Sequence, residues 1–122
     1  MIPADWIPYH RTDDDELIGY LQPTANGDLL PVTLFGHPLA DEGGEEWWAA
    51  DVLEGLGLSY LADTWELRGD DGSWSRVVIN ECDRERIVVA NADFAKLVDR
   101  PSEMYGDRVT LPVPTDRLRP RQ

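Results

Sequence analysis

Two glycine turns, each between apolar segments, place the strongest constraint on how this chain of 122 residues folds. The turns are Asn26-Gly27 and Asp71-Gly72. The apolar segments that flank them are residues 16–22 and 29–36 around the first, and 61–68 and 74–82 around the second. Asn-Gly and Asp-Gly favour two-residue hairpin turns, because both central residues of a type I′ turn need positive φ. The sequence therefore predicts two antiparallel β-hairpins.

The first turn also predicts how its two strands are paired. A two-residue turn opposes Tyr20 to Thr33 and Leu21 to Val32. Pro31, in the second strand, has no backbone N–H to donate to a neighbouring strand. We therefore expect this strand to lie at the edge of its sheet or to be bulged.

The remaining apolar segments complete a small α+β fold. Residues 61–92 are typical of a three-stranded antiparallel meander, and residues 108–113 of a last strand. Together with the first hairpin, this predicts about six mostly antiparallel strands in a curled or barrel-like sheet. The sequence also predicts one longer amphipathic helix at about 45–56 and a short helix at about 93–99.

The length and the ends of the chain predict one domain. A chain of this size forms a single core, so we expect one domain over residues 1–122. Within it, residues 1–12 are expected to form an extended arm and residues 115–122 a flexible, Arg-bearing tail. No apolar run approaches the roughly 18 residues of a membrane span, and no secretory signal pattern opens the chain. With a single cysteine and no intramolecular disulfide, these features favour a soluble, cytoplasmic protein without a membrane partner.

The charge is strongly negative. The chain has 24 acidic and 11 basic side chains, which gives a formal net charge of −13. Such a field repels nucleic acid and anionic membranes and attracts basic proteins. Two explanations remain: the acidity serves solubility or follows coding bias, or it forms an acidic binding face.

The helix at 45–56 carries the sharpest indication of function, because it has two adjacent tryptophans. Neighbours on a helix point about 100° apart, so Trp47 and Trp48 cannot share one core face. Trp48 falls on the apolar stripe that we expect to face the core. Trp47 falls on the other side, within about 40° of Asp51 and Glu54.

Three environments are open to Trp47. The N-terminal arm, with Trp6 and Tyr9, covers it; or it anchors a partner, as tryptophan often does at interface hot spots; or it is simply exposed. A homodimer through this face is disfavoured, because it brings two sets of carboxylates together. The residues of the expected binding face are Trp47, Asp51, Glu54, Glu45, Glu46, Trp6 and Tyr9.

No catalytic, cofactor or metal motif is present in the sequence. Cys82 stands beside Glu81 and Asp83, which raise a thiol pKa, so we expect a small core residue and not a nucleophile. His37 precedes a proline and has no second histidine or cysteine at ligand spacing, so we expect a turn residue.

The clusters of acidic and basic residues also have a structural explanation and do not indicate a binding site. The acidic clusters 13–16 and 69–71 match no calcium loop and are expected to be solvated turns. The tail arginines are expected to fold back onto acidic side chains such as those at 13–16. These arginines are Arg117, Arg119 and Arg121.

Three classes of function follow from these features. The first is a non-catalytic protein–protein interaction module that binds a basic partner, with an acidic inhibitor of the immunity-protein type or a nucleic-acid mimic as a special case. The second is a small enzyme that uses carboxylates alone or with a divalent metal. The third is a small-ligand binder with a pocket between helix and sheet, lined by Trp48, Trp65 or Trp74. The sequence favours the first class, without cofactor or metal, and leaves the oligomeric state open.

Overall fold

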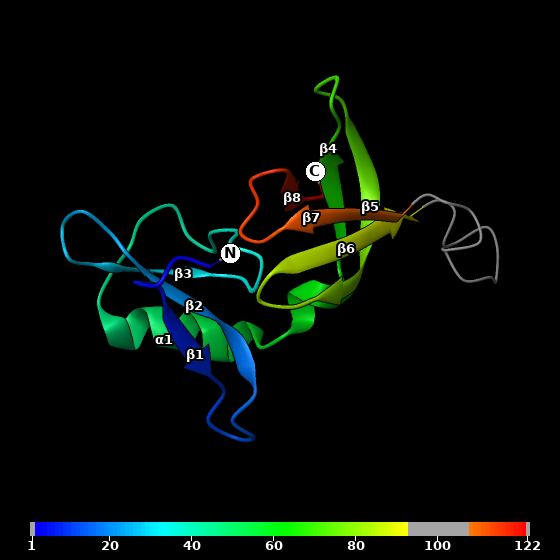
Figure 1. Cartoon of the computed structure of the whole chain (residues 1–122). Helices are drawn as coiled ribbons and strands as arrows, with labels where there is room; N and C mark the ends of the chain where they lie inside the picture. The colour runs from blue at the N-terminus through cyan, green and yellow to red at the C-terminus, as the bar shows by residue number, and fades with distance from the viewer. Residues whose placement is uncertain (1, 93–107, 122) are drawn as a thin grey trace.

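The computed structural model describes residues 2–92 and 108–121 and confirms the α+β class (Figure 1). Within these ranges the chain forms eight strands, one α-helix and one 3-10 helix. In chain order they are β1 (Ile7–His10), β2 (Leu17–Pro23), β3 (Leu29–Val32), α1 (Glu46–Leu56), η1 (Ser59–Ala62), β4 (Thr64–Arg68), β5 (Trp74–Cys82), β6 (Arg86–Asn91), β7 (Arg108–Pro112) and β8 (Leu118–Pro120). The short helix expected at 93–99 lies outside the described residues.

The strands form two antiparallel sheets, not the single curled or barrel-like sheet that we expected. One sheet has the order β1-β2-β3 and the other β7-β6-β5-β4-β8, and they do not close into a barrel. The meander predicted at 61–92 is confirmed as β4, β5 and β6. The two strands beyond the expected six are β1 and β8, which lie in the segments expected to be the arm and the tail. Their backbone groups find partners there, on β2 and β4.

Both predicted hairpins are present, but their turns are one residue longer than we expected. In the first, Gly27 donates to the carbonyl of Thr24 at 3.1 Å, and Thr24 donates to that of Asp28 at 2.9 Å. Gly27 has a φ of 88°, whereas Asn26 keeps a negative φ. This is a type I turn followed by a left-handed glycine, the usual three-residue hairpin loop. Asn26 supports the turn because its side-chain oxygen accepts from the N–H of Asp28 at 3.1 Å.

The longer turn corrects the predicted register. Tyr20 is opposite Val32, and Leu21 is opposite Pro31, each one residue from the expected partner. Because opposed residues share a face, the shift moves Val32 to the face of Tyr20. The expectation for Pro31 is confirmed, since β3 is an edge strand of its sheet.

The helix predicted at 45–56 is confirmed as α1, and it packs against β2 and β3. Ala49 and Leu53 are fully buried and form one core with Ile18 and Leu21 of β2. Leu56, which the helical periodicity also places on the core side, is 40% exposed. The helix ends at Gly57, whose N–H donates to the carbonyl of Leu53 at 2.8 Å. No helix among the described residues is long and apolar enough to cross a membrane.

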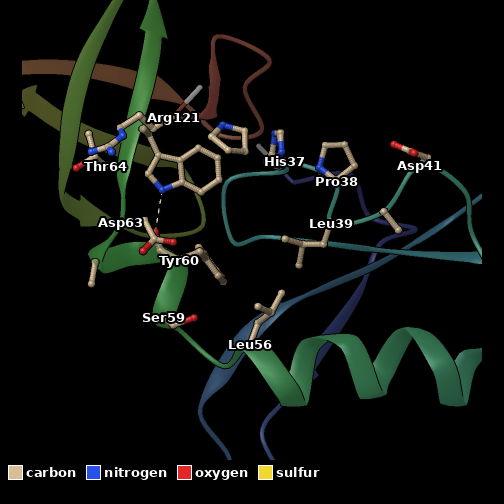
Figure 2. Close-up of a pocket in the computed structure, with 14 residues that line it drawn as sticks. His37, Pro38, Leu39, Asp41, Leu56, Ser59, Tyr60, Asp63, Thr64 and Arg121 are labelled. Carbon is tan, nitrogen blue, oxygen red and sulfur yellow. Dashed lines mark hydrogen bonds between the residues drawn. The ribbon is translucent and has the colours of Figure 1, made fainter.

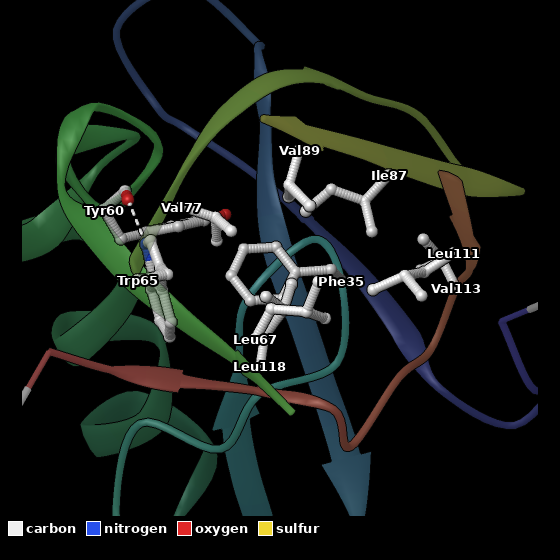
Figure 3. Close-up of a cluster of buried hydrophobic side chains, with 10 residues drawn as sticks. All are labelled: Phe35, Tyr60, Trp65, Leu67, Val77, Ile87, Val89, Leu111, Val113 and Leu118. Atoms are coloured by element: carbon white, nitrogen blue, oxygen red, sulfur yellow. Dashed lines mark hydrogen bonds between the residues drawn. The ribbon is translucent and has the colours of Figure 1, made fainter. Parts of the chain in front are cut away.

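A second core lies on the five-stranded sheet, and a side chain from the other half of the chain fills it. Phe35, in the loop after β3, is fully buried among residues of that sheet (Figure 3). Its ring lies 4.9 Å from that of Trp65 and 5.9 Å from that of Tyr60, both edge to face. Such pairs stabilise beyond the area that they bury. Phe35 therefore joins the three-stranded sheet to the five-stranded one.

The hydroxyl of Tyr60 makes the second connection between the halves. Tyr60, in η1, is buried, and its hydroxyl donates to the carbonyl of Ile18 at 2.8 Å. The same oxygen accepts from the N–H of Leu34 at 3.0 Å. It therefore supplies the hydrogen-bond partner of a strand carbonyl and of a loop N–H, both of which lie inside the fold.

We expect Tyr60→Phe to destabilise the fold by about 2 kcal/mol, because it leaves the Ile18 carbonyl and the Leu34 N–H without their partner. Urea unfolding followed by circular dichroism measures this as a lower midpoint at an unchanged m-value. Tyr9→Phe is the matched control, since the Tyr9 hydroxyl bonds only to the side chain of Glu54 near the surface. Equal losses in the two variants would contradict the bridging role of Tyr60.

Two alanine substitutions test the backbone assignments. An added Cβ meets no atom within 4 Å at either Gly55 or Gly27, so neither change is limited by space. Gly55→Ala, in the last turn of α1, should stabilise by about 0.5 kcal/mol by restricting the unfolded chain. Gly27→Ala should destabilise by about 1 kcal/mol, because its φ of 88° is strained for a residue with a Cβ. Thermal unfolding of both variants checks the two opposite signs.

Candidate functional site

Trp47 is the most exposed of the large hydrophobic side chains described, with 68% of its surface accessible. It lies in the first turn of α1, and its indole N–H donates to the carboxylate of the helix-capping residue, Glu45. The arm does not cover it, which removes the first of the three environments considered for this side chain. The N–H edge of the indole is therefore bonded to a carboxylate, while most of the side chain is exposed to solvent.

Three carboxylates stand on the helix around Trp47. Glu45, Glu46 and Asp51 are all exposed. Glu46 and Asp51 make no hydrogen bond or ion pair with any described residue, so their charges are uncompensated locally. We call Trp47, Glu45, Glu46 and Asp51 the Trp47 face. It offers one large apolar surface surrounded by negative charge.

Glu54 and Tyr9, also expected at the binding face, are bonded to each other. The Glu54 carboxylate accepts from the Tyr9 hydroxyl at 3.0 Å and from the backbone N–H of Thr12 at 2.9 Å. The Thr12 N–H is the main cause that lowers the pKa of Glu54 below its ordinary value, with the Tyr9 hydroxyl adding to it. Burial and the same carboxylate raise the pKa of Tyr9. This pair connects α1 to the β1 side of the sheet and so holds the helix in place.

Trp6 lies away from the Trp47 face. Its ring is 6.2 Å from that of Tyr20, with the two planes tilted by 53°. A Cβ at Gly19 would meet the side chain of Leu53 in α1, and successive strand residues point to opposite faces, so Tyr20 and the Trp6 ring beside it lie on the face of the sheet away from the helix. The structure therefore brings together four of the seven expected residues and uses Glu54, Tyr9 and Trp6 within the fold.

Cys82 lies where its thiol pKa is raised, as its sequence neighbours predict. Burial, with a smaller contribution from Asp83, raises the pKa of the thiol to about 12. At neutral pH the group is a thiol, which is a weak nucleophile. It packs at the border of the core on the five-stranded sheet.

His37 lies in the turn after β3, as expected, and its ring is half-buried. The ring lies 5.2 Å from that of Trp65, edge to face. Burial lowers the pKa of His37 below its ordinary value of 6.5, so the ring is neutral at pH 7. In the described ranges, 2–92 and 108–121, no three His, Cys, Asp or Glu side chains gather as metal ligands.

Two of the three tail arginines, Arg117 and Arg119, do fold back onto the chain, but not onto residues 13–16. Arg119 pairs with Glu66 at 2.7 Å, and Arg117 donates to the backbone carbonyl of Arg68 at 3.0 and 2.9 Å. The cause is β8, which pairs with β4 and so carries these side chains to the five-stranded sheet. Among the acidic residues at 13–16, Asp14 pairs instead with Arg11, at 2.8 Å.

The three tryptophans proposed to line a ligand pocket lie apart. Trp65 is buried in the core and borders a groove, whereas Trp48 packs against Gly44 beside a smaller hollow. Trp74 is covered by Arg119, whose guanidinium carbon lies 3.9 Å from the ring centroid. No single pocket unites them in the part of the chain that the structure describes.

Comparison with known proteins adds no assignment: no protein family model matches the chain, and no curated protein or solved structure is significantly similar to it. The function must therefore be argued from the residues themselves.

Sequence reasoning missed Tyr60, which orders both sides of the molecule. The only local sign is an aromatic residue three positions after the glycine that ends α1. Its hydrogen-bond partners, Ile18 and Leu34, are 42 and 26 residues away along the chain. No periodic pattern reports a contact at such separations.

We expect the free energy of unfolding to fall as the pH is lowered from about 7.5 to 5.5, with His37 as one cause. Its pKa is lowered in the folded protein, so the unfolded chain takes up the proton more readily once the pH falls below about 6.5. Urea titrations across this pH range measure the change, and an NMR titration of the ring gives the pKa directly. His37→Asn should reduce the slope, whereas His10→Asn, which leaves the buried ring in place, should not.

Proposed function

We propose that this protein is a non-catalytic interaction module, active in the cytoplasm, which binds a basic protein through the Trp47 face. The observation that carries the proposal is the exposure of Trp47, at 68%, in the middle of uncompensated carboxylates. A solvent-exposed indole loses contact with water when a partner covers it, and tryptophan is among the residues most enriched at interface hot spots.

The charge supports a basic partner. With a net charge of −13, the whole chain attracts cationic surfaces and repels nucleic acid. Near Trp47 the carboxylates of Glu46 and Asp51 have no cationic partner of their own among the described residues. Long-range attraction would speed the encounter, and the indole would supply most of the affinity.

The rigidity of α1 supports the same use. Its inner side is fixed by the buried residues Ala49 and Leu53, and its outer side by the bond between Glu54 and Tyr9. The helix therefore loses little conformational freedom when it binds, which favours affinity. An inhibitor that blocks a cationic active site, of the immunity-protein or nucleic-acid-mimic type, would use such a preorganised acidic face.

We expect the wild-type chain to retain a basic partner from native, nuclease-treated lysate, and Trp47→Ser to lose it. Truncating an anchor tryptophan costs about 2 kcal/mol or more, a factor of roughly 30 in affinity. Moderate salt should weaken retention, because it screens the carboxylates. The retained protein is then purified, and its affinity for both chains is measured by calorimetry.

Ile7→Ser is the matched control, because Ile7 is another exposed large hydrophobic residue, at 42%, and lies on β1. It should retain the partner as the wild type does, and all three chains should melt at similar temperatures. The proposal is wrong if no protein is retained, if the retained protein is acidic, or if Trp47→Ser binds it as tightly as Ile7→Ser.

A further inference from the structure

An open groove of about 880 Å³ lies between the two halves of the fold (Figure 2). Its walls come from the turn after β3, the end of α1, η1, the start of β4 and the end of β8. We call it the His37–Trp65 groove. A volume of this size accommodates a drug-sized molecule.

The floor of the groove is apolar. Leu39 and Leu56 contribute to it, with the neutral ring of His37, whereas Trp65 lies beside that ring with only 3% of its surface accessible. The indole N–H of Trp65 already donates to the carbonyl of Tyr60 at 2.8 Å, so it is not available to a ligand. The floor therefore recognises a hydrocarbon or aromatic body by contact.

Leu56 gives a second indication of an apolar occupant. Its position on α1 belongs to the core stripe, yet 40% of its surface is accessible, because it faces the groove and no side chain of the described residues covers it. A ligand that covers Leu56 removes apolar surface from water, which is favourable.

The rim of the groove is predominantly acidic. Asp41 and Asp63 line it, and neither carboxylate makes a hydrogen bond or ion pair with a described residue. Arg121 is the single basic side chain in the lining, and Figure 2 shows Arg121 and Asp63 at one end of the groove and Asp41 at the other. The net charge of −13 adds to the local excess of negative charge. Cations are therefore concentrated at this opening and anions repelled.

We propose that the His37–Trp65 groove binds a small organic cation, an amine on an aromatic or aliphatic body, with the body on Leu39 and Leu56 and the ammonium at the carboxylate of Asp41. The two recognition elements are separate in the structure: contact on the floor and charge on the rim. This inference does not depend on the Trp47 face, which lies near the other end of α1.

The test compares three probes with the same body and different charge: phenylbutylamine, phenylbutanol and phenylbutyrate. Each is titrated into the full-length, ¹⁵N-labelled chain and followed by NMR. The amine should shift the backbone amides of Leu39, Asp41 and Leu56, with an affinity in the millimolar range typical of a ligand this small. The alcohol should bind more weakly and the carboxylate most weakly.

Substitutions test the apolar contact and the charge separately. Asp41→Asn should lower the affinity for the amine about threefold and leave that for the alcohol unchanged, as expected for an exposed charge pair. Leu56→Ser should weaken the amine and the alcohol alike. Asp70→Asn is the charge-matched control: it lies in the β4–β5 turn with a fully exposed side chain, and it should change nothing.

The proposal is overturned if phenylbutylamine shifts no groove resonance, if its shifts gather elsewhere, or if phenylbutyrate binds as tightly as the amine. The last result would mean that Arg121, not Asp41, determines which ligand binds. Trp47→Ser should leave amine binding unchanged, so this test and the partner-binding test fail or succeed separately.

Discussion

The fold depends on the contact at which the two sheets meet, made by Phe35 and Tyr60. Phe35 leaves the three-stranded half and fills the core of the other, while the Tyr60 hydroxyl bonds to a carbonyl and an N–H of the first half. Among residues 2–92 and 108–121, no other side chain bonds to this carbonyl and this N–H. The contact holds η1 against β2, and η1 in turn sets the distance between the end of α1 and the start of β4. The His37–Trp65 groove is a consequence of that distance.

Both surfaces proposed for binding belong to the same helix and favour the same charge. Trp47, at the start of α1, is surrounded by carboxylates, and Leu56, at its end, faces a groove with an acidic rim. The tail holds three of the eleven basic side chains, and two of them, Arg117 and Arg119, are engaged along β4 and do not offset this acidity. Negative charge alone would be explained by its effect on solubility. Here the carboxylates lie next to exposed apolar side chains, and this combination favours the binding of cations.

Elements with a strong local pattern were predictable from the sequence. The helix, the meander and the two glycine turns each depend on residues close together along the chain, and the position of Trp47 on the side of the helix away from the core followed from the 100° step between helical neighbours. The register of the first hairpin was predicted one residue off, because Asn-Gly fits both a two-residue turn and a three-residue loop with Gly27 alone left-handed. The split into two sheets was not predictable, since strand patterns indicate buried faces but not which strands become neighbours. Of the expected binding face, Glu54 and Tyr9 were correctly placed near each other but engage each other within the fold.

The sequence by itself determined the α+β class, the turns, the helix with its two tryptophans on different sides, and the acidic charge, because each is a local or compositional property. Only the tertiary structure decided that Trp47 stays uncovered, that the arginines of the tail pair along β4, and that Leu56 faces a groove. These depend on contacts between residues far apart in the chain, such as those of Tyr60 with Ile18 and Leu34. The free energy of such contacts comes from filling one shared interior, and no segment carries that information alone.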